Sequence, residues 1–77
     1  MDLYEKIKRN KHNVIPRQLI ELLESYGFEY KSTEGDHVHY KRPGFRRFPV
    51  PVRQNPLAIH IVQAALCMIE EIRELEQ

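Results

Sequence analysis

The chain has 77 residues, of which 42% are hydrophobic and 30% are charged, and it carries a net charge of +1. This length and balance predict one small folded domain rather than a disordered chain. No apolar run approaches the roughly 20 residues that a membrane helix needs, and the N-terminus has no signal-peptide pattern. The sequence contains a single cysteine, Cys67, which excludes an internal disulfide or a thiolate metal site. We therefore expect a cytoplasmic protein.

A short opening helix is predicted by apolar residues at helical spacing, namely Leu3, Tyr4 and Ile7. A second helix is expected to begin at Pro16, because proline suits the first helical turn. It is expected to end at Gly27, because glycine readily adopts the left-handed conformation of a helix terminus. Leucines between these two positions recur at the spacing of one helix face.

Three short strands are expected next, because apolar and polar residues alternate in three successive segments. The segments are residues 28–33, 36–42 and 46–52, separated by turn signals at Glu34-Gly35 and Pro43-Gly44. The alternation predicts that Tyr30 and Tyr40 belong to the core.

The hydrophobic pattern also selects the register of the second and third strands. A three-residue loop, Pro43-Gly44-Phe45, pairs Tyr40 with Phe48 and Val38 with Val50. A two-residue loop would mix apolar and polar side chains on both faces of the sheet. Because a slip of one residue turns every side chain over, the three-residue loop is favoured.

The third strand is predicted to be an edge strand. We expect the favoured register to place His39 opposite Arg47 on the polar face, which Pro49 and Pro51 share. Prolines at alternate positions lack backbone donors, and this suits an edge that faces solvent.

The closing helix is expected to have Asn55 as its N-cap and Pro56 in its first turn, and to end near Leu75. Its apolar residues form two rows, Ile59, Val62, Leu66 and Ile69 in one, and Ala58, Ile61, Ala65, Met68 and Ile72 in the other. One row is enough to cover the sheet. The surplus suggests a partner or self-association through this helix, unless the opening helix covers it.

The order helix–helix–strand–strand–strand–helix predicts an α+β fold, a three-stranded antiparallel sheet with helices packed on its apolar face. We expect a single domain over residues 1–77, with an N-terminal extension over residues 1–13 and a core over residues 14–76. The polar face of the sheet would then carry His37, His39, Lys41 and Arg47.

Charge is unevenly distributed along the chain. Residues 37–53 contain five Lys or Arg and no Asp or Glu, whereas residues 70–77 contain four Glu and one Arg. A basic middle segment beside an acidic end favours an anionic partner at the middle, with phosphate as the first candidate. A solvated charged face is the simpler interpretation when charge is considered alone.

Four segments follow one another in an order that resembles the HicA-type toxin family. They are the helix of residues 19–28 (LIELLESYGF), residues 35–40 (GDHVHY), the proline-rich strand of residues 48–51 (FPVP) and the closing helix, and they span about residues 14–72. The resemblance implies a helix–three-strand–helix fold similar to double-stranded-RNA-binding domains. It further implies a metal-independent endoribonuclease that cleaves messenger RNA without a cofactor and is silenced by a cognate HicB-type antitoxin.

The signature of that family is Gly-Ser-His with a catalytic histidine, so the resemblance gives this role to His37, preceded by Gly35. Asp36 stands where the family usually has serine. Neighbours on a strand point to opposite faces, so contact between Asp36 and His37 depends on the geometry of the turn. The substitution is neutral, tunes the histidine, or marks a member that binds RNA without cleaving it.

Metal-free cleavage of RNA requires two proton transfers and stabilisation of a charged phosphorus centre, and histidine suits the proton transfers near neutral pH. Lys41 and Arg47 are expected to stabilise the developing negative charge. His39 is interpreted as a second proton carrier or an RNA contact. The remaining expected RNA contacts are Gly35, Arg42, Arg46 and Arg53, since arginine binds phosphate but stays protonated.

Two other functions stay open. One is a non-catalytic RNA-binding module of the same fold, and the other is an interaction domain whose closing helix pairs with another protein. Without the resemblance, each histidine of the strands is most simply a surface residue.

Overall fold

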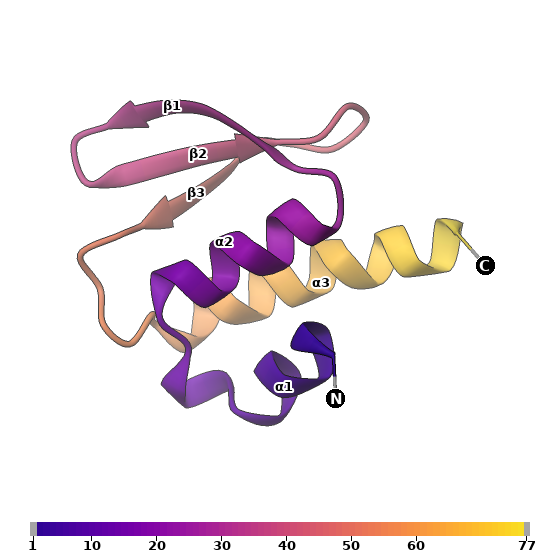
Figure 1. The fold of residues 1–77 in the computed structure, drawn as a ribbon, viewed down its shortest axis with the longest axis horizontal. Coiled ribbons are helices and arrows are strands. Elements are labelled where there is room, and N and C mark those ends of the chain that lie inside the picture. Colours follow the sequence, from indigo (N-terminus) through magenta and orange to yellow (C-terminus); the bar gives the residue numbers. More distant parts are fainter. Residues whose placement is uncertain (1, 77) are drawn as a thin grey trace.

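The computed structural model describes residues 2–76, which form a three-stranded antiparallel sheet of order β1-β2-β3 with helices on one side (Figure 1). In chain order the elements are α1 (Leu3–Arg9), the 3₁₀ turn η1 (Lys11–Asn13), α2 (Pro16–Ser25), β1 (Glu29–Glu34), β2 (His37–Lys41), β3 (Phe48–Pro51) and α3 (Ile59–Leu75). The predicted α+β fold is confirmed, and α2 to α3 follow the expected helix–three-strand–helix order. None of the helices within residues 2–76 has the length and apolar character to cross a membrane.

The first two helices lie where the sequence predicts them. Asp2 caps α1 by accepting a hydrogen bond from the Glu5 N–H at 2.9 Å. Pro16 opens α2, as expected, and Gly27 ends it with a φ of +87°.

The core lies between α2, α3 and the inner face of β2 and β3, with α1 on the far side of the two longer helices (Figure 1). Its fully buried side chains include Leu19, Leu22, Leu23, Val50, Val62, Ile69 and Ile72. Tyr40 is 6% exposed, as predicted, but the prediction for Tyr30 is wrong, because its side chain is 55% exposed. Tyr30 packs edge-on against Tyr40 with ring centroids 6.1 Å apart, but β1 is the strand farthest from the helices, which do not cover it.

The register predicted from the hydrophobic pattern is confirmed, since Tyr40 pairs with Phe48 and Val38 pairs with Val50. β3 is an edge strand, also as predicted. The expected pairing of His39 with Arg47 is wrong. This register places His39 opposite Pro49, and Arg47 precedes β3 in the exposed loop.

The two prolines of β3 differ in environment, because Pro49 is exposed and Pro51 is buried. Val52, which continued the predicted alternation, lies outside β3 and is 41% exposed. Its N–H donates to the Asp36 carbonyl at 2.9 Å, which shows that the donors of alternate residues along this strand face β2. At the positions in between, Pro49 and Pro51, the backbone nitrogens point away from β2 toward the free edge of the sheet, and because both residues are prolines these nitrogens carry no hydrogen.

The predicted start of the closing helix at Asn55 and Pro56 is wrong, because α3 begins at Ile59. Leu57 is 2% exposed, and its N–H donates to the Val14 carbonyl at 2.8 Å. This long-range contact keeps the preceding residues in an irregular loop, in which the Asn55–Pro56 peptide bond is cis. The predicted end of the helix at Leu75 is confirmed.

Both apolar rows of α3 contribute buried side chains. The apolar surface of α3 that the sheet does not cover is covered by α1 and the residues that follow it. Tyr4 is 5% exposed, and its hydroxyl donates to Glu70 Oε2 at 2.7 Å. The guanidinium of Arg73 lies 4.2 Å from the centre of the Tyr4 ring. Burial, followed by the hydrogen bond to Glu70, raises the pKa of Tyr4. With the opening helix covering this surface, self-association through α3 stays a prediction, as does the division into an extension and a core.

Replacing Ile7 by alanine should show that α1 is part of the core. Ile7 is 2% exposed, so its truncation is expected to lower the free energy of unfolding by about 2–4 kcal/mol. Urea denaturation measures the change, with Lys6→Ala on the exposed face of the same helix expected within about 0.5 kcal/mol of the parent protein. Equal stability of the two variants would contradict the packing of α1.

Candidate active site

His37 is the first residue of β2 and directly follows the tight turn Gly35-Asp36, in which Gly35 has a φ of +61°. Its side chain is 47% exposed. The turn brings Asp36 beside it, with Asp36 Oδ1 3.0 Å from His37 Nδ1. The contact that the sequence left to turn geometry is therefore made. Within residues 2–76, Nε2 of the ring has no hydrogen-bonding or ionic partner, so this nitrogen is the one that a substrate can reach.

His39 occupies the middle of β2, between Ser32 on β1 and Pro49 on β3. Its side chain is only 14% exposed, and its Nε2 lies 3.5 Å from Glu34 Oε1. Nδ1 of His39 and Oγ of the opposing Ser32 are buried without hydrogen-bonding partners among the described residues. The two histidines thus share one face of the sheet, but His37 is far more accessible.

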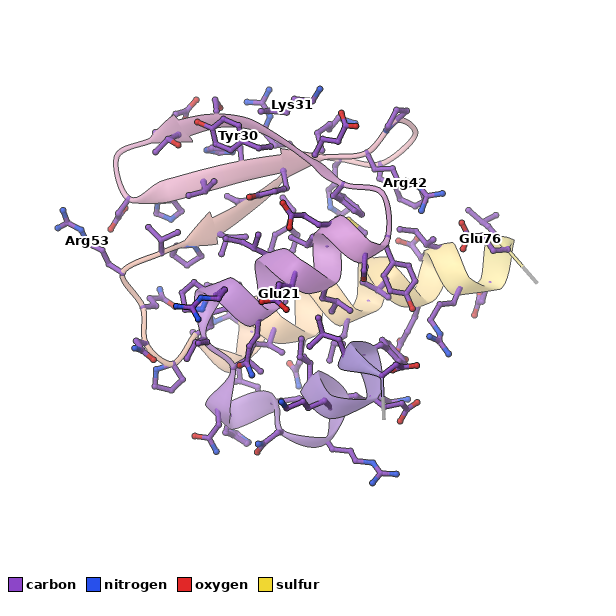
Figure 2. All side chains as sticks on the ribbon, in the orientation of Figure 1. Glu21, Tyr30, Lys31, Arg42, Arg53 and Glu76 are labelled. Atoms are coloured by element: carbon purple, nitrogen blue, oxygen red, sulfur yellow. The ribbon has the colours of Figure 1, made fainter. Side chains whose placement is uncertain are left out.

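Lys41 and Arg47 share a sheet end with each other but not with His37. Lys41 is the last residue of β2, about 13 Å from His37 at roughly 3.3 Å per residue. Its ammonium donates to the carbonyls of Arg42 and Phe45 and so holds the loop between β2 and β3. Arg47 lies outside β3, in the loop before it, so the expected place of Arg47 on the polar face of that strand is wrong. That either cation stabilises charge at His37 stays a prediction. Arg53 follows β3 at the His37 end and points outward to solvent (Figure 2).

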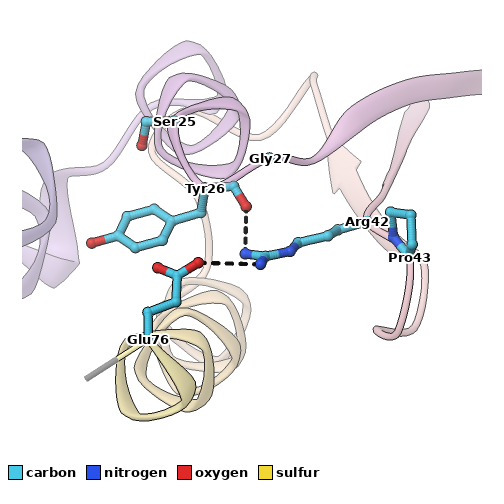
Figure 3. Close-up of a pocket in the computed structure, with 6 residues that line it drawn as sticks. All are labelled: Ser25, Tyr26, Gly27, Arg42, Pro43 and Glu76. Carbon is cyan, nitrogen blue, oxygen red and sulfur yellow. Dashed lines mark hydrogen bonds and ion pairs between the residues drawn. The ribbon is translucent and has the colours of Figure 1, made fainter.

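Arg42, expected to contact RNA, is engaged by the protein itself (Figure 3). Its Nη1 donates to the Tyr26 carbonyl at 2.8 Å, and its Nη2 lies 3.2 Å from Glu76 Oε2. The guanidinium also lies 5.3 Å from the centre of the Phe45 ring. Arg42 therefore ties the end of β2 to the ends of α2 and α3, across a cleft at the opposite end of the sheet from His37. Sequence reasoning missed this role, because no local pattern marks a contact between residues 26, 42 and 76.

The remaining arginines expected to bind RNA, Arg46 and Arg53, are exposed, and so is Gly35 of the turn. Within residues 2–76, no group of three or more His, Cys, Asp or Glu side chains is placed to hold a metal ion. At the His37 end the structure thus places an exposed imidazole 3.0 Å from a carboxylate, with the exposed Arg53 side chain at the same end of the sheet.

Replacing Arg42 by alanine should reveal its structural role. Loss of the bond to the Tyr26 carbonyl, more than loss of the exposed ion pair with Glu76, is expected to lower the free energy of unfolding by about 1–2 kcal/mol. Thermal or urea denaturation measures it. Arg46→Ala, in the exposed loop, serves as the control and should change stability by less than about 0.5 kcal/mol. A matching small effect for Arg42 would argue that its contacts are not formed in solution.

Comparison with known proteins places the chain in a family. The family model described as the HicA toxin of bacterial toxin–antitoxin systems matches residues 16–69, which is more than half of the chain. Neither the curated proteins nor the solved structures give a match. The matched residues contain α2, the whole sheet and most of α3, including His37 and the turn before it. The chain therefore belongs to the HicA toxin family of bacterial toxin–antitoxin systems.

Proposed function

We propose that this toxin is an endoribonuclease that cleaves messenger RNA, with His37 as its general base. The observation that carries the proposal is the state of His37. Its imidazole lies in the segment that resembles the family signature and within the residues that match the family, is about half exposed, and has its Nδ1 3.0 Å from Asp36 Oδ1. A neutral imidazole that donates from Nδ1 to a carboxylate carries its free lone pair on Nε2. Nε2 is therefore the atom that accepts a proton from the bound RNA in this proposal.

The reaction needs no cofactor in this proposal. Nε2 of His37 takes the proton of a ribose 2′-hydroxyl, and the 2′-oxygen attacks the adjacent phosphorus. The bond from phosphorus to the 5′-oxygen breaks and a water gives that oxygen a proton, leaving a 2′,3′-cyclic phosphate and a 5′-hydroxyl. The protonated ring then gives its proton to the hydroxide that this water becomes, which restores the neutral imidazole. The Asp36 carboxylate faces the positive charge that the ring gains. Arg53, two residues beyond the Pro51 that pairs with His37, is the exposed arginine at the same end of the sheet and the candidate to contact the phosphate. One positioned base contributes about 10²–10⁴ in rate, a modest catalysis that suffices for a growth-inhibiting toxin.

Asp36 acts as a positioning residue in this mechanism. It replaces the serine of the family signature and touches the histidine rather than the substrate. Because both side chains are about half exposed, the pair adds little to stability, and its effect lies in fixing the ring and its tautomer. His39, mostly buried beside Glu34, is better placed to shape the surface than to exchange protons with RNA.

Cleavage assays on purified variants test the role of His37. In the presence of a chelator, His37→Ala should lose at least about 100-fold in the rate of messenger RNA cleavage while keeping the parental circular dichroism spectrum. His39→Ala should retain more activity, because the side chain is less accessible. Lys31→Ala, on exposed β1, is the control expected to behave as the parent. Full cleavage by His37→Ala would refute the mechanism.

The same assay distinguishes the ribonuclease from a non-catalytic RNA-binding module. This alternative stays open because Asp36 stands where the family usually has serine. If neither the parent nor His37→Ala cleaves RNA, but both bind it with strong salt dependence, the protein is an RNA-binding module. If the parent protein does cleave RNA, its cognate antitoxin, in this proposal a HicB-type protein, should suppress that cleavage.

The role of Asp36 has a spectroscopic readout that is independent of activity. Long-range ¹⁵N–¹H spectra at alkaline pH should show the neutral His37 ring protonated on Nδ1 in the parent. In Asp36→Ala the ring should change to the Nε2-protonated tautomer, and cleavage should fall by about tenfold or more. Asp36→Glu, which keeps a carboxylate, should restore part of both. An unchanged tautomer in Asp36→Ala would show that the carboxylate does not hold the ring.

A further inference from the structure

A second concave surface lies between the start of β3 and the first half of α3, away from His37. It has a volume of about 350 Å³ and is called the β3–α3 groove below. The apolar part of its lining, called the floor below, consists of Phe48, Pro49, Ile61 and Ala64, and the other lining residues are Arg46, Arg47 and His60. A volume in this range is enough to hold a small planar group. No sequence pattern brings these residues together, because they come from a loop and strand before residue 50 and from a helix after residue 58.

The charge of the groove favours an anionic occupant. None of its lining residues is Asp or Glu. Arg46 and Arg47 are exposed, and within residues 2–76 their guanidinium groups form no ion pair or hydrogen bond. Arg42, by contrast, is held by Tyr26 and Glu76. The two loop arginines are therefore available to bind phosphate oxygens.

The backbone of β3 argues against a protein strand as the occupant. A strand that adds to a sheet edge needs alternating donors and acceptors. The outward positions of β3 are Pro49 and Pro51, so this edge presents carbonyls without N–H groups. A nucleic acid strand does not need this ladder. Its phosphates bind arginine, and its bases lie against flat or apolar side chains.

The position of the groove relative to His37 points to the same occupant. Pro51 pairs with His37, and β3 runs from there back to Phe48 and the two arginines. The separation along the strand is about 10 Å at roughly 3.3 Å per residue. An RNA strand bound at His37 can thus continue along this edge into the groove.

We propose that the β3–α3 groove binds a single-stranded segment of the RNA substrate next to the cleavage site. Arg46 and Arg47 contact its phosphates, and one base lies over Pro49, Ile61 and Ala64 beside the His60 ring. This proposal rests on the proposed function only in naming the RNA as substrate, because binding can be measured without cleavage.

Fluorescence anisotropy of a labelled 12-nucleotide single-stranded RNA tests the charge contribution in the His37→Ala protein. Adding Arg46→Glu and Arg47→Glu should weaken binding by about tenfold or more and make it less salt-dependent. The control is Arg9→Glu with Arg17→Glu, which changes the net charge equally on exposed positions of α1 and α2. Equal losses in the two double variants would mean general attraction by charge and would overturn the proposal.

A change of shape at constant charge tests the floor. Ala64→Trp fills the groove from an exposed position of α3, whereas Gln63→Trp adds the same side chain one residue away, outside the lining. Only Ala64→Trp should weaken RNA binding, by several-fold, with thermal denaturation showing that both variants fold. Equal binding by the two would overturn the proposal, and so would loss of antitoxin binding with RNA binding intact. If the parent protein cleaves no RNA but Ala64→Trp still weakens its RNA binding, the groove proposal holds and the proposed ribonuclease function is rejected.

Discussion

The pairing of β2 with β3 is the constraint on which the site depends. With Tyr40 opposite Phe48 and Val38 opposite Val50, the apolar side chains of both strands turn toward α2 and α3. The same alternation turns His37 and His39 to the open face, because successive side chains of a strand point in opposite directions. Moving the register by one residue would bury the histidines and expose the core, so stability and the candidate chemistry are set by one arrangement.

Two sets of contacts fix the ends of this small fold. At one end, Arg42 joins β2 to the last turns of α2 and α3. On the far side of the helices, Tyr4 and Ile7 bury the face of α3 that the sheet does not need. A domain of this size buries a limited share of its surface, so each contact matters more than it would in a larger protein. At the other end, the Val52 N–H donates to the carbonyl of Asp36 in the turn, while Gly35 and His37 are exposed to solvent there.

Much of this arrangement could be predicted from the sequence, because it follows from local patterns. The order of elements, the β2–β3 register and the edge strand all depend on the spacing of apolar residues and prolines. The failures involve contacts between distant segments. The start of α3 depends on the bond between Leu57 and Val14, and the exposure of Tyr30 depends on how far the helices extend under the sheet. For the candidate site, the resemblance to the family pointed to His37, and its role stays a prediction. The contact between His37 and Asp36 and the hydrogen bonds that hold Lys41 to its own loop have no sequence signal.

The docking of α1 has a consequence for how the chain varies. Its polar partners on α3, Glu70 and Arg73, lie beyond the residues that match the family, as does α1 itself. The N-terminal helix therefore contacts residues at the other end of the chain as well as the core that it shares with α2. A change at Tyr4 alters the surroundings of Glu70 and Arg73 at once, so substitutions at the two termini are not independent. We expect the side chains of α1 and of the last turns of α3 to vary together, because each forms part of the other's surroundings.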